Sequence, residues 1–208
     1  PKECFSGSLD GNWCAWQTAI GKLLDTEGGT YSRLPSLTSF SDWKNVNTVY
    51  GEKADLSKHP QKKGTIDLLI AKTREDNDLG YAVFSNPEEG YLYYQVKNSK
   101  SLPYTMLWLF NGGRHFEPWN GTVDGCLGVE EMSGRICIFD DDFPQNSDKY
   151  MIPFIPNNET IVRQAYGAVS LPTGSKYISE SHMTARGIEV VFDNGKTIKI
   201  QVDLSFLG

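Results

Sequence analysis

From Thr65 to the end of the chain, short strand-like segments alternate with turn residues, and this succession constrains the possible folds most. Residues 66–71 and 105–110 are apolar runs of the length expected for strands that are buried on both faces. Further strands are expected near 81–85, 91–96, 126–130, 135–139, 161–171 and 177–183. Roughly nine or ten strands with one weak helix predict a mostly β chain, an antiparallel β-sandwich with few short helices. At 208 residues the chain is long enough for one such domain over residues 1–208.

The C-terminal segments also indicate how two strands pair. Alternate apolar residues of 188–192 share one face of a strand, and so do those of 198–202. A two-residue loop would place the two apolar rows on opposite faces of the hairpin. A three-residue loop ending in Gly195 pairs Val190 with Ile198 and buries both rows together. We therefore predict the longer loop, with Gly195 in the left-handed position that such loops need.

The N-terminal part of the chain is less strand-like. Apolar residues recur at helical spacing between Trp13 and Leu24, which predicts a weak helix that ends at Gly28–Gly29. Residues 30–64 are rich in Ser, Asn, Lys and Pro and are expected to be irregular. Because so long an irregular run is uncommon in a compact domain, it is either a functional loop or a region whose elements the pattern does not reveal.

Charge and composition argue against several function classes. The formal net charge of −6 argues against a nucleic-acid partner, which would favour a basic surface. No apolar run approaches the ~20 residues that span a bilayer, so no membrane partner is expected. The chain does not open with a basic-then-apolar leader, which favours a cytoplasmic protein. No phosphate loop or dinucleotide fingerprint is present, and no cofactor is expected.

The cysteines give no sign of a metal site. None forms a C-x-x-C pair, so zinc and thioredoxin-type sites have no support and no metal is expected. The chain is larger than the small domains that depend on disulfides. We therefore predict free, mostly buried thiols at all four positions, Cys4, Cys14, Cys126 and Cys137.

The stretch from Leu107 to Glu131, LWLFNGGRHFEPWNGTVDGCLGVEE, carries the residues best suited to a binding site. It begins as a buried strand, breaks at Asn111–Gly113, continues as a loop with Arg, His and Trp, and returns to a strand that ends in two glutamates. Aromatic rings stack on the apolar face of a pyranose, while Arg, Asn and carboxylate groups hydrogen-bond its hydroxyls. A carboxylate at a strand end can also take a hydroxyl proton. The stretch therefore predicts a sugar site.

Residues 50 to 140 resemble aldose-1-epimerase (galactose mutarotase-like) proteins in the order of their motifs. That order is a strand end reading W-L-F-N, a Gly-Gly-Arg loop, Pro-Trp and then G-C-L-G-V-E; the upstream segment Asp55–Pro60 also fits. Such proteins form a large β-sandwich and interconvert the α and β anomers of free aldoses. A glutamate removes the proton of the anomeric hydroxyl and a histidine protonates the ring oxygen. The resemblance thus implies an isomerase that acts on a small saccharide without a cofactor.

The resemblance also implies roles for single residues. The position that matches the glutamate motif is Glu130, which would be the catalytic base. The implied substrate contacts lie in the loop that faces the same cleft or at its edge: Trp108, Asn111, Arg114, His115 and Trp119. Glu131, the next residue along the strand, should point to the opposite face and into solvent.

The chain departs from the family in two respects. The family's catalytic histidine lies upstream in an aromatic- and Asn-containing strand motif, and none of His59, His115 and His182 has such a context. The chain is also short for the family. It is therefore either a fragment of a longer protein or a divergent member that has lost or relocated the acid. The alternative function is a non-catalytic carbohydrate-binding β-sandwich module of a larger carbohydrate-active protein.

Plainer structural roles stay open for the same residues. Trp108 sits in a buried strand and can serve as core, and Glu130 can pair with a nearby Lys or Arg. Tyr91, Tyr93 and Tyr94 suggest a binding face, but alternating tyrosines in a strand are mostly ordinary sheet packing, which is the interpretation that we favour.

Overall fold

The structure is a computed structural model that describes residues 5–9, 12–15, 32–35, 38–74, 77–134, 152 and 155–208. Two five-stranded antiparallel sheets carry most of the chain. Sheet A has the strand order β12 (Gln164–Ser170), β9 (Tyr91–Asn98), β8 (Leu79–Asn86), β1 (Phe5–Leu9) and β6 (Lys58–His59). Sheet B has the strand order β11 (Cys126–Met132), β10 (Tyr104–Asn111), β7 (Thr65–Lys72), β2 (Asn12–Ala15) and β3 (Thr38–Phe40).

Two smaller sheets complete the described chain. The C-terminal sheet consists of β13 (Ile178–Thr184), β14 (Gly187–Phe192) and β15 (Thr197–Gln201), and a short 3₁₀ helix, η2 (Leu204–Leu207), follows it. A two-stranded ribbon joins β4 (Val46–Asn47) to β5 (Lys53–Ala54). No helix in the described ranges is long and apolar enough to cross a membrane.

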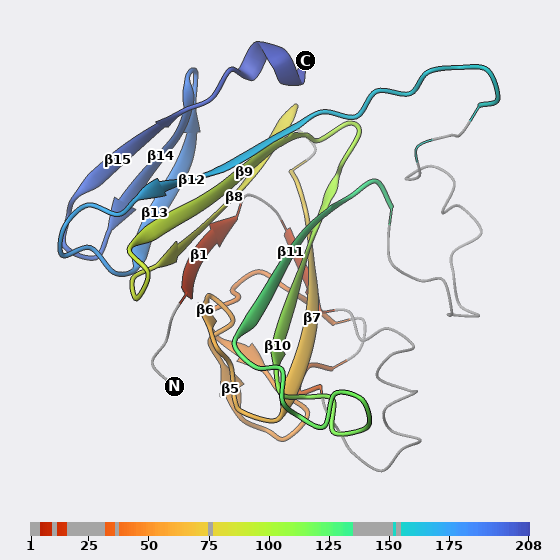
Figure 1. Cartoon of the computed structure of the whole chain (residues 1–208), viewed down its shortest axis with the longest axis vertical. Helices are drawn as coiled ribbons and strands as arrows, with labels where there is room; N and C mark the ends of the chain where they lie inside the picture. The colour runs from red at the N-terminus through yellow and green to blue at the C-terminus, as the bar shows by residue number, and fades with distance from the viewer. Residues whose placement is uncertain are drawn as a thin grey trace.

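Sheet A is the middle layer of three, with sheet B on one side and the C-terminal sheet on the other (Figure 1). One core lies between sheets A and B, where Phe84 meets Leu107 and Leu109. A second core lies on the other face of sheet A, where Leu92 packs with Val190 and other apolar residues of the C-terminal sheet. The alternation of side chains along β8 and β9 supplies both cores, because successive residues of a strand point to opposite faces.

Most of the expected strands from Thr65 onward are confirmed. The expected segments correspond to β7, β8, β9, β10, β11, β12 and β13, while 135–139 lies outside the described residues. The chain is mostly β and its sheets are antiparallel, as predicted. The hairpin register is also confirmed, since Val190 pairs with Ile198 and the amide of Phe192 donates to the carbonyl of Lys196. Gly195 has a φ of 78°, the left-handed conformation that closes this loop.

The N-terminal prediction needs correction. Trp13 lies on β2, paired with Ala71 and Phe40, and not in a helix. Residues 16–29, which contain the rest of the expected helix and its stop, lie outside the described residues. Pairing with two neighbouring strands has outweighed a weak helical period here. Residues 30–64 contain the short strands β3 to β6. Strands of two or three residues are too short to show an alternation in the sequence.

Candidate functional site

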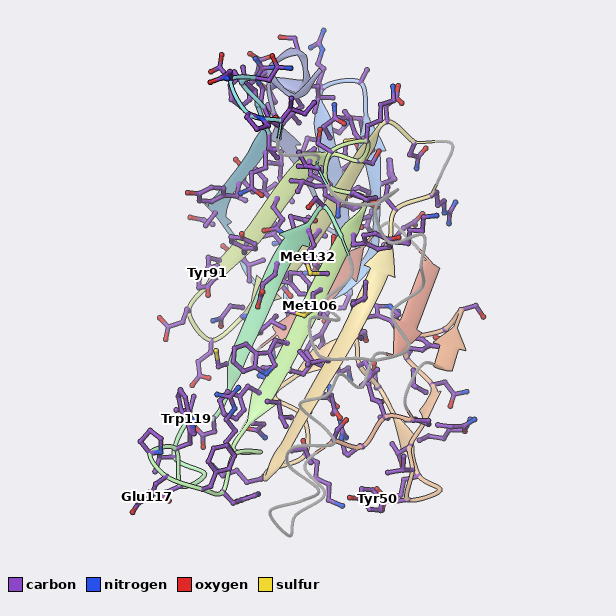
Figure 2. All side chains as sticks on the ribbon, turned by 90° about the vertical axis from the view of Figure 1, so that its right-hand side faces the viewer. Tyr50, Tyr91, Met106, Glu117, Trp119 and Met132 are labelled. Carbon is purple, nitrogen blue, oxygen red and sulfur yellow. The ribbon has the colours of Figure 1, made fainter. Side chains whose placement is uncertain are left out.

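The outer face of sheet B brings together several of the predicted site residues. Leu107 and Leu109 of β10 point into the core between the sheets, so Trp108 and Phe110 point to the opposite face of sheet B, where Phe110 is itself buried. On the neighbouring strand β11, Glu130 pairs with Met106, and Gly128 pairs with Trp108. Figure 2 looks onto this outer face, with Met106 and Met132 on the strands and Trp119 in the loop beyond the end of β10. We call the outer-face set Trp108, Phe110, Arg114, Trp119 and Glu130 the aromatic face.

Arg114 is the centre of the aromatic face. Its guanidinium carbon lies 4.8 Å from the ring centre of Trp119, 5.2 Å from that of Trp108 and 5.7 Å from that of Phe110. The rings of Trp108 and Phe110 are stacked, 5.4 Å apart and within 4° of parallel. Each ring attracts the cation through its negative face. Among the described residues Arg114 has no carboxylate partner, and burial lowers the pKa of its guanidinium. The result is a partly buried cation held by three rings.

Glu130 lies beside Trp108 on the same face. Its Oε1 is 3.2 Å from the place that a Cβ on Gly128 would take, and the Cβ of Trp108 is 3.1 Å from that place. The glycine therefore leaves room for the carboxylate against the indole. Although the residue as a whole is exposed, desolvation raises the pKa of the Glu130 carboxyl. A raised pKa suits a carboxylate that takes and returns a proton near neutral pH.

Asn111 holds the loop that follows β10. Its side chain is buried, its Nδ2 donates to the carbonyl of Gln61, and its Oδ1 accepts from the amide of Gly125 at 3.1 Å. Gly113, near the start of the loop, has no space for a side chain, because a Cβ there would lie 2.5 Å from the amide nitrogen of Ile66. The predicted role of Asn111 as a sugar contact stays a prediction, but its polar atoms already close this loop.

His115 is exposed and lies at the side of the same loop. Its Nε2 is 3.3 Å from the carbonyl oxygen of Gly64, and its ring packs beside Gly64 and Gly121. The glycines leave space for the imidazole. The contact of His115 with a substrate stays a prediction.

A buried ion pair anchors the base of the loop. Asp67 of β7 has a side-chain exposure of 0%, and the Nε of Arg33 donates to it at 2.9 Å. Arg33 also donates to the side chain of Gln61 at 2.7 Å, and the backbone of Gln61 in turn accepts from Asn111. This chain of bonds links the end of β10 to the inner side of sheet B. Sequence reasoning missed it, because a lone Arg in an irregular segment gives no sign of its partner.

The prediction of a solvated Glu131 is wrong. Its side chain does point away from that of Glu130, but it lies between sheets A and B with an exposure of 2%. Its carboxylate pairs with Lys97 and accepts from Thr105 Oγ1 at 2.7 Å and from Gln95 Nε2 at 2.6 Å. A charge in the interior must be paired and hydrogen-bonded, and here both conditions are met. The opposite face of β11 is an interior one, which the strand pattern alone does not reveal.

The thiol prediction is also corrected in part. Cys126 is free but exposed, because it opens the edge strand β11 on its outer face. No group of three or more His, Cys, Asp or Glu side chains in the described ranges is placed to hold a metal ion. A scan against protein-family models, a search of curated proteins and a search of solved structures each find no match for this chain.

Proposed function

We propose that this chain binds a small saccharide at the aromatic face and that Glu130 acts there as a base in interconverting the anomers of a free aldose. The observation that carries the proposal is the convergence of Arg114, two indole rings and Glu130 on one face of sheet B. Rings of this kind stack on a pyranose, and the guanidinium donates to its hydroxyls. We also propose that sheets A and B form a sandwich of the galactose mutarotase-like type.

The proposed reaction needs two proton transfers. Glu130 removes the proton of the anomeric hydroxyl while the bond between the anomeric carbon and the ring oxygen breaks and the ring oxygen gains a proton. The open-chain aldehyde rotates and closes again, and the protons return by the reverse path. The raised pKa of Glu130 favours the first transfer, since a carboxylate of higher pKa is the stronger base. No cofactor takes part.

One observation favours the alternative, a non-catalytic carbohydrate-binding module. The second transfer needs an acid, and the nearest histidine in the loop, His115, lies against the carbonyl of Gly64. A binding module needs the rings and the guanidinium of Arg114 but no acid. Both functions use the same face, so they differ in turnover and not in the place where sugar binds.

Exchange NMR of anomeric protons tests the proposal across a small panel of aldoses. We expect wild-type protein to accelerate anomer exchange and Glu130→Gln to lower the rate by about 10²- to 10⁴-fold, the usual effect of losing one acid or base. Glu180→Gln, an exposed glutamate of β13, is the matched control and should leave the rate unchanged. Sugar line broadening without exchange, lost in Arg114→Ala, would establish the binding module. No response to any sugar would refute both functions.

A further inference from the structure

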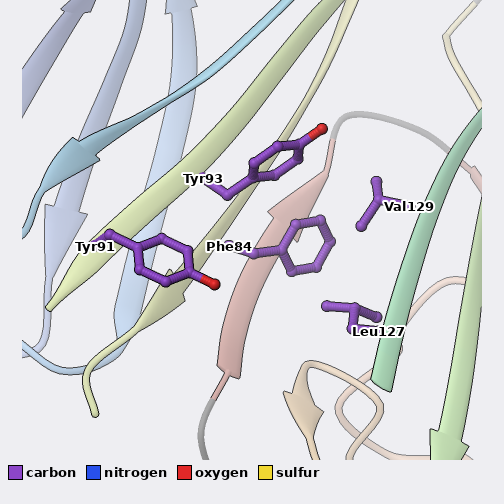
Figure 3. A pocket seen from close by; sticks show the side chains of 5 residues that line it. All are labelled: Phe84, Tyr91, Tyr93, Leu127 and Val129. Atoms are coloured by element: carbon purple, nitrogen blue, oxygen red, sulfur yellow. The ribbon is translucent and has the colours of Figure 1, made fainter. Parts of the chain in front are cut away.

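A separate pocket lies between sheets A and B, on the other side of β11 from the aromatic face. It has a volume of about 230 Å³ and is lined by Phe84, Tyr91, Tyr93, Leu127 and Val129. Figure 3 shows the three rings, carried by β8 and β9, facing the two aliphatic side chains of β11. An apolar cavity of about 150 Å³ is large enough to hold benzene. This pocket therefore has room for one aromatic ring with a substituent.

The two phenol groups give the pocket one donor and one acceptor. The hydroxyl of Tyr93 donates its hydrogen to Oε1 of Gln95 at 2.6 Å, which leaves the lone pairs of its oxygen as an acceptor. The hydroxyl oxygen of Tyr91 accepts from Nδ2 of Asn86 at 3.3 Å, and within the described part of the chain its own hydrogen has no acceptor. A ligand hydroxyl can therefore accept the hydrogen of Tyr91, while the Tyr93 hydroxyl points toward Gln95.

The pocket favours a neutral ligand. None of the five lining side chains carries a charge. The carboxylate of Glu131 is paired with Lys97 and accepts from Nε2 of Gln95 at 2.6 Å. Burial, followed by the charge of Glu131, raises the pKa of Tyr93, so its phenol stays protonated. An anionic ligand would lose its hydration here without gaining a cation in return.

We propose that this pocket binds a small, neutral phenol, with the ring between the tyrosines and β11 and its hydroxyl accepting from the hydroxyl of Tyr91. The size of the pocket selects a single ring, its lining selects an apolar body, and the donor of Tyr91 selects a ligand with one hydroxyl. The site shares no lining residue with the aromatic face, so binding at this pocket can be tested independently of saccharide binding.

Methyl NMR titration with p-cresol tests the pocket, with toluene and 4-methylbenzoate as probes of matched shape. We expect p-cresol to shift the methyl signals of Leu127 and Val129 in a saturable way. The dissociation constant should be on the order of 1 mM, as for ligands of about eight non-hydrogen atoms. Toluene, which lacks the hydroxyl, should bind about fivefold more weakly, and the benzoate should leave these signals unchanged.

Two substitutions make the test specific. Tyr91→Phe should lower the affinity for p-cresol about fivefold and leave that for toluene unchanged, because only the donor is lost. Tyr94→Phe, on the same strand but facing the other core, is the matched control and should change neither affinity. Val129→Phe should fill the pocket and abolish both. The proposal is overturned if p-cresol leaves the two residues unshifted, if toluene binds as tightly as p-cresol, or if Tyr91→Phe has no effect.

Discussion

The burial of His59 predicts how much the free energy of unfolding decreases in mild acid. Its side chain lies on β6 at the edge of sheet A with an exposed fraction of 1%. Burial lowers the pKa of its imidazole from 6.5 to about 4, opposed only in part by a hydrogen bond with the backbone of Gly125. Burial disfavours the charged form, so the folded protein holds this histidine neutral where an unfolded chain would protonate it.

The sign of the effect on stability follows from proton linkage. Above pH 6.5 the imidazole is neutral in both states and contributes nothing to the pH dependence. As the pH falls through the window from 6.5 to 4, only the unfolded state gains the proton, so the free energy of unfolding decreases. The loss is about 2 kcal/mol at pH 5 and reaches about 3 kcal/mol below pH 4, from the 2.5-unit difference in pKa.

Urea unfolding of wild type and His59→Gln at pH 7, 6, 5 and 4.5 measures this loss. Carboxylates titrate near the lower end of the range in both proteins, so the informative quantity is the difference between the two curves. We expect that the variant's free energy of unfolding falls by about 2 kcal/mol less than that of wild type between pH 7 and pH 5. His182→Gln, which removes an exposed imidazole of β13, is the control and should follow the wild-type curve. Parallel curves for wild type and His59→Gln would refute the argument.

Two further substitutions test the buried ion pair between the sheets and the close approach of the loop after β10 to β7. Lys97→Met leaves the carboxylate of Glu131 buried without its cation, and we expect a loss of about 3–5 kcal/mol in urea unfolding, most of it recovered in the double variant Lys97→Met/Glu131→Leu. If the single and double variants are equally unstable, the ion pair is not the cause. Gly113→Ala would place a Cβ 2.5 Å from the backbone of Ile66, and the overpacking should lower the free energy of unfolding by about 1–3 kcal/mol. Wild-type stability in this variant would contradict the close approach of the loop to β7.

The strands could be predicted where each is long enough to show its period. Residues 91–96 of β9 alternate and residues 105–110 of β10 are nearly all apolar, so the sequence predicts both strands. The hairpin of β14 and β15 was predictable in register as well, because only one loop length buries both apolar rows. The short strands β3 to β6 could not be predicted, since they owe their conformation to the neighbours they pair with.

The candidate site could be predicted only in part, and the reason lies in which partner each side chain meets. The sequence predicts Arg114, Trp108 and Trp119 in one site, and the structure places the guanidinium over both indoles. The alternating tyrosines of β9 indicate ordinary packing, yet two of them, Tyr91 and Tyr93, line a pocket with residues of β11. That pocket depends on how sheet B packs against sheet A, which no local sequence pattern predicts.

The register of β11 decides which of two adjacent glutamates lies on the aromatic face. Glu130 points outward beside Trp108, where desolvation raises the pKa of its carboxyl, while Glu131 points inward to Lys97. A slip of one residue would exchange the two, because side chains alternate along a strand. The hydrogen bond from Gly125 to Asn111 fixes the start of β11, and the buried pair of Glu131 fixes its far end. The contacts that fix the register of β11 thus keep Glu130 on the aromatic face, although the buried pair of Glu131 lies on the other side of the sheet.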